Sequence, residues 1–132
     1  LLTVRDSSVR KGNDVGGLAA TATNYCTVMI WNYHDDDSIG LPEQVAVQVS
    51  SLPSKKITFT QYRIDKDHSN AYEVWKQMGS PQQPTKSQIT TLEKAGMLQV
   101  MDKPGKMDVK NGILDYHLSL PGQAVALLKI EW

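Results

Sequence analysis

Apolar and polar residues alternate strictly along two stretches of this 132-residue chain, 45–50 and 114–120. Valine alternates with Ala, Gln and Ser in the first, and Leu and Tyr alternate with Asp, His and Ser in the second. A period of two puts successive side chains on opposite faces, so each stretch predicts a β-strand with one buried face. With the final apolar run, 124–130, these stretches supply the side chains that we expect to be largely buried: Val45, Val47, Val49, Leu114, Tyr116, Leu118, Val125 and Leu127.

Further strands are predicted near both ends of the chain. Residues 25–33 and 124–130 are nearly continuous apolar or β-favouring runs, which is typical of strands covered on both faces. Residues 18–23 predict a short strand. The polar residues 1–17, which end in Gly16-Gly17, predict a loop or a frayed edge.

The stretch after the first alternating segment changes phase part of the way along. Ile57 and Phe59 share one face of an extended chain, whereas Tyr62 and Ile64 fall on the other. If all four are buried, one extra residue must be inserted between the two pairs. We therefore expect a β-bulge near Thr60-Gln61.

A helical period replaces the strand period in the middle of the chain. Apolar residues at i, i+3, i+4 and i+7 form one helical face: Ala71, Val74, Trp75 and Met78. Asn70, with Glu73 three residues later, predicts an N-terminal cap, and Gly79 predicts the C-terminal end. The first helix is therefore expected near residues 70–79.

A second helix is predicted near residues 85–95. Thr85, with Gln88 three residues later, has the pattern of a capping box, and Gly96 predicts the end. Its apolar face consists of little more than Ile89 and Leu92. We expect such a helix to lie on a surface rather than to cross a core.

The order of these elements predicts the fold class. Strand patterns occur consecutively on both sides of the helical segment, and Lys110-Asn111-Gly112 before the last pair has the composition of a hairpin turn. We predict an all-β, antiparallel β-sandwich of the immunoglobulin or fibronectin kind, with a short two-helix insertion near 70–96. Residues 1–17 are expected to be a polar lead-in and 18–132 the sandwich domain.

Charge and composition narrow the classes of partner. Fourteen basic and fourteen acidic residues cancel, and nucleic acid or an anionic membrane would favour a basic face, so we expect neither as a partner. The single cysteine, Cys26, lies in an apolar run and is expected to be a small buried hydrophobic residue. The chain opens on Leu1-Leu2-Thr3-Val4 without a methionine or a signal peptide. We expect an excised piece of a longer protein, and its compartment stays open.

Two polar clusters are candidates for chemistry. The three carboxylates and the imidazole of residues 34–37 have the chemistry of calcium or zinc ligands, but adjacent residues rarely all face one ion, so we expect a solvated loop. Asp67, His68 and Ser69 include the residue types of a catalytic triad, but they lack a nucleophile elbow. We expect them to lead from a strand into the first helix and to cap it.

Carboxylates and tryptophans give no clear sign of a sugar-cleaving site. Glycosidases need two carboxylates facing each other across the sugar, and with fourteen acidic residues some pair is inevitable. Trp31 and Trp75 lie in apolar patterns and are expected in the core rather than on a sugar-stacking platform, while Trp132 is undecided. We predict no catalytic, cofactor-binding or metal-binding residue in this chain.

Several blocks of the sequence nevertheless resemble the C-terminal region of family 39 glycoside hydrolases, the β-xylosidases. The blocks are residues 28–37 (VMIWNYHDDD), 62–72 (YRIDKDHSNAY) and 74–85 (VWKQMGSPQQPT), with Leu120-Pro121 and 124–128 (AVALL) after them. The resemblance covers about 18–132. A weaker likeness extends to the sandwich domain of α-L-iduronidases.

The resemblance implies a parent enzyme with a (β/α)₈ barrel that hydrolyses β-xylosides with retention, through two glutamates. The family's Asn-Glu-Pro motif is absent here, and 132 residues are too few for a barrel of about 250. We therefore expect a non-catalytic accessory domain that packs on the barrel of the same parent chain, or on a second subunit. The alternative is a free-standing carbohydrate-binding module for xylan-type sugars.

Overall fold

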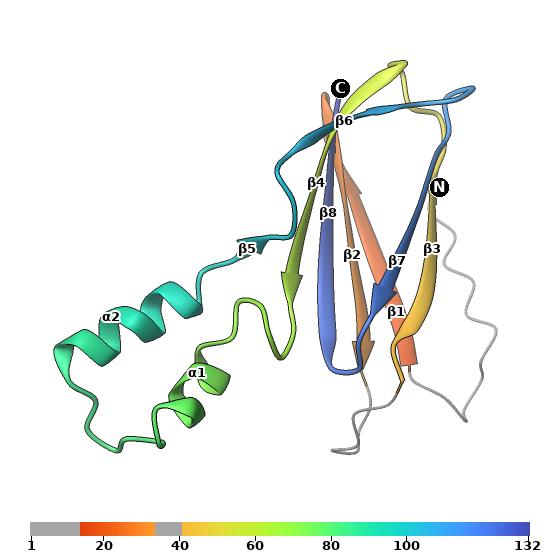
Figure 1. Ribbon diagram of the computed structural model, residues 1–132. Coiled ribbons are helices and arrows are strands. Elements are labelled where there is room, and N and C mark those ends of the chain that lie inside the picture. Colours follow the sequence, from red (N-terminus) through yellow and green to blue (C-terminus); the bar gives the residue numbers. More distant parts are fainter. Residues whose placement is uncertain (1–13, 34–40) are drawn as a thin grey trace.

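Two antiparallel sheets face each other in the computed structural model, which describes residues 14–33 and 41–132 (Figure 1). The larger sheet has the order β1-β2-β8-β4-β5, and β6 also pairs with β4. The smaller sheet pairs β3 with β7. The strands are β1 (Asp14–Thr21), β2 (Tyr25–Tyr33), β3 (Glu43–Val49), β4 (Lys56–Ile64), β5 (Gln99–Val100), β6 (Gly105–Asp108), β7 (Leu114–Leu120) and β8 (Ala124–Glu131). The predicted all-β sandwich is confirmed.

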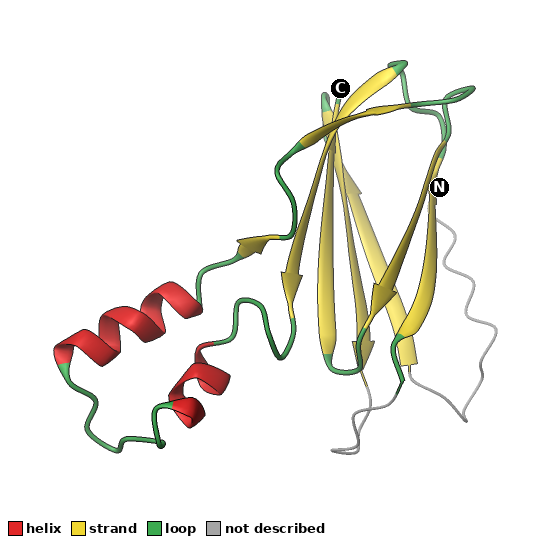
Figure 2. Ribbon diagram, viewed as in Figure 1, coloured by secondary structure: helices red, strands yellow, loops and turns green. Residues whose placement is uncertain are grey.

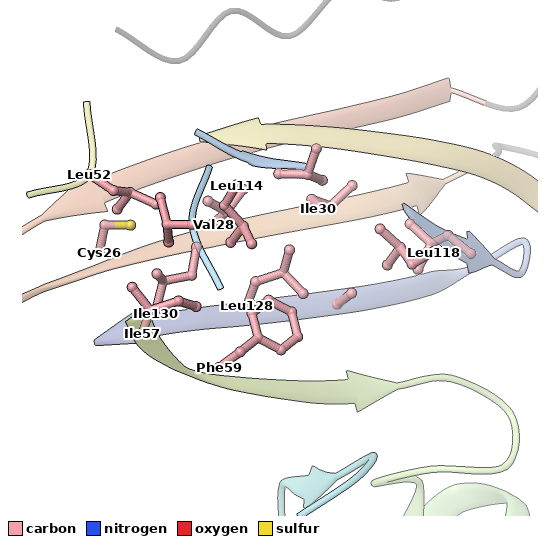
Figure 3. Packing of buried hydrophobic residues seen from close by; sticks show 14 of the residues in the cluster. Cys26, Val28, Ile30, Leu52, Ile57, Phe59, Leu114, Leu118, Leu128 and Ile130 are labelled. Carbon is pink, nitrogen blue, oxygen red and sulfur yellow. The ribbon is translucent and has the colours of Figure 1, made fainter. Parts of the chain in front are cut away.

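The core lies between the two sheets (Figure 3). It is formed by alternate residues of the strands, as the period-two pattern predicts for β3 and β7. Val47, Leu114 and Leu118 are buried, and Val45, Val49 and Tyr116 are partly buried against them. The other buried apolar residues are Cys26, Val28, Ile30, Leu52, Ile57, Phe59, Val109, Leu120, Ala124, Ala126, Leu128 and Ile130.

The predicted burial of Val125 and Leu127 is wrong. The core-facing side of β8 is formed by Ala124, Ala126, Leu128 and Ile130, and Val125 and Leu127 lie on the opposite, partly exposed side. Lys129 and Glu131 belong to the same alternating set as Val125 and Leu127, so the charged end of the strand indicates that this set points outward. The prediction rested on the apolar run alone and did not use this charged phase.

The predicted β-bulge is also absent. β4 pairs with β8 in one unbroken register, from Thr58↔Glu131 to Ile64↔Val125. The core-facing set of β4 continues beyond Phe59 as Gln61 and Arg63, both buried. The phase change therefore marks the point where the buried face becomes polar, and the outward face carries the apolar residues instead.

These buried polar side chains have partners on the smaller sheet. The Tyr116 hydroxyl donates to Gln61 Oε1 at 2.6 Å, and Arg63 Nη1 donates to the carbonyl oxygen of Ser119 at 3.2 Å. On β2, Asn32 Nδ2 donates to the carbonyl oxygen of Leu120 at 3.0 Å. One end of the sandwich thus contains hydrogen-bonded polar side chains beside buried apolar ones such as Leu120 and Ala126.

The first strand begins earlier than predicted. β1 pairs with β2 from Asp14↔Tyr33 to Thr21↔Cys26, so Gly16-Gly17 is part of a strand and not a loop. Gly16 is directly opposite Trp31, and a Cβ atom at Gly16 would lie 2.6 Å from the indole ring. The glycine therefore gives the tryptophan ring room to lie against β1. Residues 1–13 lie outside the described part of the chain.

Both predicted helices are confirmed, as α1 (Ala71–Gln77) and α2 (Lys86–Ala95). They leave the sandwich at the end of β4 and return at β5, so that they project beside the sheets (Figure 2). No helix in the described ranges is long and apolar enough to cross a membrane.

Candidate functional site

The most distinctive surface feature is the pair of helices, which we call the helical arm (residues 65–98). Neither α1 nor α2 contains a buried residue. Figure 1 shows both helices standing away from the two sheets. Large apolar side chains on the arm are solvent-exposed: Tyr72 (61%), Ile89 (44%), Met97 (67%) and Leu98 (50%). Exposed apolar side chains gathered on one projecting element are typical of an interaction surface.

The arm starts from a turn organised by Asp65, a buried residue directly after β4. Its Oδ1 atom accepts hydrogen bonds from the backbone amides of Asp67 and His68, both at 2.9 Å, and from His68 Nδ1 at 2.8 Å. Its Oδ2 atom lies 3.7 Å from Arg63 Nη1. The carboxylate therefore acts as the structural centre of the turn.

Ser69 joins the two strands at which the arm begins and ends. Its hydroxyl donates to the carbonyl oxygen of Arg63 on β4 at 2.7 Å and accepts from the amide of Gln99 on β5 at 2.8 Å. Asn70 follows as the predicted N-cap, with its Oδ1 accepting from the Glu73 amide at 3.1 Å. Both ends of the arm are thereby fastened at one point.

This geometry supports the capping interpretation of Asp67, His68 and Ser69. A nucleophile needs a base within hydrogen-bond reach, and the Ser69 hydroxyl instead contacts two backbone groups while His68 Nδ1 contacts Asp65. The other polar cluster, residues 34–37, lies outside the described residues. Across 14–33 and 41–132, no three His, Cys, Asp or Glu side chains gather in a group that could hold a metal ion.

The first helix presents a structured polar and aromatic surface. Tyr72 and Trp75 stack with ring centroids 5.7 Å apart, and Trp75 Nε1 donates to the carbonyl oxygen of Pro81 at 3.0 Å. Lys76 Nζ lies 4.8 Å from the Tyr72 ring centroid and 2.6 Å from Glu73 Oε1, and this hydrogen bond raises the pKa of Lys76. The hydrogen bond to Pro81 fastens α1 to the segment that leads to α2, and the other contacts lie within α1.

The ends of both helices follow the predicted residues. Gly79 has a φ of +85° directly after the C-cap residue of α1, and its amide donates to the carbonyl oxygen of Lys76. This backbone conformation strongly favours glycine. Thr85 and Gln88 form the complete capping box of α2, and Gly96 is its C-cap.

The two tryptophans that the sequence predicts in the core do not lie there. Trp31 and Trp75 are outside the core cluster, whereas Trp132 is partly buried against it. Trp132 borders a groove of about 360 Å³ between the two sheets. Its other lining residues are Ala19, Ala20, Thr21, Cys26, Val28, Gln48, Val49, Ser50, Ser51 and Leu52.

The polar end of the sandwich was not predicted from the sequence. Asn32 Oδ1 and Arg63 Nε are buried without a hydrogen-bond partner in the described structure. The signal was present in the apolar phase change after Phe59, which we attributed to a bulge. Arg63 lies between two apolar neighbours in the sequence. This pattern fits a bulge that buries the neighbours, and it fits equally a regular strand that buries the arginine. Only the partner strand distinguishes the two.

Comparison with known proteins agrees with this fold. The sequence profile of glycosyl hydrolases family 39 matches residues 9–106. A β-xylosidase from Geobacillus stearothermophilus is 25% identical over 103 residues, which cover 78% of this chain and 20% of that protein. The solved structure of the family 39 enzyme from Xanthomonas axonopodis pv. citri superposes with a TM-score of 0.76 at 14% identity, over 87% of this chain and 25% of its own.

A solved bacterial orthologue of human α-L-iduronidase gives a TM-score of 0.68 at 18% identity, over 90% of this chain and 22% of its own. This chain therefore spans only about a fifth to a quarter of the length of the proteins that it resembles. The profile match covers most of the chain. The chain belongs to glycosyl hydrolases family 39, and its described residues form an antiparallel β-sandwich.

Proposed function

We propose that this chain is the non-catalytic C-terminal accessory domain of a retaining β-xylosidase, whose absent (β/α)₈ barrel hydrolyses xylo-oligosaccharides. The helical arm is the observation that carries the proposal. It is fastened at both ends, it exposes apolar side chains, and it belongs to a chain that covers about a quarter of the length of its solved relatives. Its function is to hold the sandwich against the barrel or against a neighbouring subunit.

The carboxylates of the described residues support a non-catalytic role. Retaining glycosidases place two carboxyl groups about 5 Å apart, one of them with a raised pKa. Asp65 is the buried carboxylate in the described ranges, and its oxygens serve the turn and Arg63. The hydrolytic groups are therefore expected in the barrel.

Hydrogen exchange tests the docking role of the arm. We expect amides of 71–77 and 86–95 to exchange more slowly in a longer chain that includes the barrel than in the isolated domain. Amides of β7 act as the control and are expected to exchange equally in both. Ile89→Ser is expected to remove the extra protection, and Thr90→Ser on the same helix to keep it. Equal exchange of the arm in both proteins would mean that it packs only on its own domain.

The groove beside Trp132 gives the carbohydrate-binding alternative a specific location. An indole at the wall and the polar side chains of Thr21, Gln48 and Ser51 are the groups that sugar rings and hydroxyls contact. Calorimetric titration of the isolated domain with xylo-oligosaccharides separates the two functions. Saturable binding that is lost in Trp132→Ala would favour the binding module, and the accessory role predicts no binding.

A further inference from the structure

We propose that the outward face of the larger sheet is the surface on which the linked catalytic domain packs. This inference rests on the proposed function and assigns its partner to a defined face. Strand pairing aligns one outward-facing residue of each strand in a single row across β1, β2, β8, β4 and β5. The row is Leu18, Met29, Leu127, Tyr62 and Val100, and every member is apolar or aromatic.

A second apolar row lies beside the first. It runs through Gly16, Trp31, Val125 and Ile64. The Trp31 ring is placed against β1, because a Cβ atom at Gly16 would be 2.6 Å from it. We call these two rows together the apolar band.

The apolar band faces away from the core, and none of the strands described in 14–33 and 41–132 packs over it. The smaller sheet packs on the opposite face (Figure 1). Leu18 (50%), Ile64 (44%) and Val100 (42%) are strongly exposed at the sides of the band. Strands that are apolar on both faces, as β2 is along most of its length and β8 is over residues 124–128, occur mainly where both faces are buried.

The apolar band has a polar border on one side and continues towards the arm on the other. The next outward row is Thr27, Lys129 and Thr60, and Lys129 Nζ lies 2.8 Å from Glu131 Oε1. On β5, Val100 lies two residues after Leu98 of the arm, and Leu98 and Met97 are both exposed. Charged groups thus limit the band at one end of the sheet, and the arm extends it at the other.

The size of the band favours a covalently linked partner over a second copy of this chain. Strands lie about 4.8 Å apart, so five strands and two rows give roughly 200 to 300 Å². A stable complex of free proteins buries about 800 Å² on each partner. A linked domain is present at an effective concentration in the millimolar range, so it can occupy a smaller surface. The chain spans about a quarter of its solved relatives, which leaves such a domain outside the structure.

Hydroxyl-radical footprinting tests the proposal directly. We expect Met29, Trp31 and Tyr62 to react in the isolated domain and to react about tenfold more slowly in a longer chain that contains the barrel. His117, exposed on the outward face of β7, is expected to react equally in both. Equal reactivity of Met29, Trp31 and Tyr62 in the two proteins would overturn the assignment. Protection in the isolated domain that disappears on dilution would show a second copy on this face and would also overturn it.

A matched pair of variants separates packing from folding. Leu127→Lys in the centre of the band is expected to restore fast reaction of Met29 in the longer chain, whereas Ala46→Lys, on the outward face of β3, is not. Both variants of the isolated domain should melt within a few degrees of the parent. If a longer chain hydrolyses aryl β-xylosides but its apolar band stays reactive, the assignment of this face is wrong while the proposed function stands. A longer chain that protects the band without hydrolysing xylosides would contradict the proposed function instead.

Discussion

Val47 shows how much a single core position contributes to the stability of the fold. It is buried on β3, opposite Tyr116 of β7. Replacement by Asp would place a charge without a partner between the sheets, so we expect Val47→Asp to lower the free energy of unfolding by about 3–5 kcal/mol. Denaturant titration of the isolated domain measures this change.

The neighbouring residue supplies the control for this substitution. Ala46 lies on the same strand but on its outward, exposed face. The cost of Ala46→Asp is expected to stay within about 0.5 kcal/mol, because the charge remains in water. Similar losses in both variants would mean that strand propensity, rather than burial, determines the effect.

Cys26 and Tyr116 are expected to make the folded state less stable at alkaline pH. Burial raises the pKa of the Cys26 thiol, and burial followed by the Asp102 carboxylate raises the pKa of Tyr116, against the opposing effect of Arg63. The folded state therefore keeps protons that the unfolded chain releases above about pH 8.5 for Cys and about pH 10 for Tyr. Stability is complete below these values and falls as the pH rises through the folded pKa values.

The free energy of unfolding is accordingly expected to decrease between pH 8 and 10 in denaturant titrations. Cys26→Ala removes one of the two groups, so its pH dependence should be flatter in this range even though its stability at pH 7 is lower. If the free energy of unfolding of Cys26→Ala falls with pH as steeply as that of the parent, the thiol does not contribute to the pH dependence.

Among the elements, the arm depends most on one side chain. Ser69 has a φ of 53° and connects the backbones of β4 and β5 through its hydroxyl. Ser69→Ala would leave the Gln99 amide and the Arg63 carbonyl without this partner, so we expect a loss of about 1–2 kcal/mol in global stability. Exchange of the Gln99 amide should accelerate more than that of β7 amides.

Ser87→Ala is the matched control, because Ser87 is exposed in the first turn of α2. It is expected to change neither the exchange of Gln99 nor the midpoint of unfolding by a measurable amount. If Ser69→Ala behaves in the same way, the arm is held by its helix packing and not by the serine.

At the scale of the whole molecule, the prediction concerns activity. We expect the purified isolated domain to release no nitrophenol from p-nitrophenyl β-xyloside, because the hydrolytic carboxylates belong to the barrel. A longer chain that includes the barrel is the positive control. Turnover that co-purifies with the folded 132-residue domain and is lost in Val47→Asp would contradict the accessory role.

Local residue chemistry determined where the helices of this protein begin and where its chain turns. The caps Asn70, Thr85 and Gln88 define where the helices begin, and they act through hydrogen bonds within a few residues. The turn at Asn111-Gly112 is equally local, since both residues have positive φ and the backbone bonds of Lys110 and Ile113 close it. Such features need no distant partner, so the sequence alone predicts them.

Tertiary packing decided which face of each apolar strand points inward. β3 and β7 have one polar face, and their orientation was predictable from the alternation. β2 is largely apolar on both faces, so the position of the smaller sheet selects Val28 and Ile30 over Met29 and Trp31. On β8, by contrast, Lys129 and Glu131 share a face with Val125 and Leu127 and mark it as the outward one. Tertiary packing also decides for β4, where Gln61 and Arg63 are buried because Tyr116 and the Ser119 carbonyl oxygen face them across the sandwich. Polar groups are buried where partners exist, and those partners are more than fifty residues away in the chain.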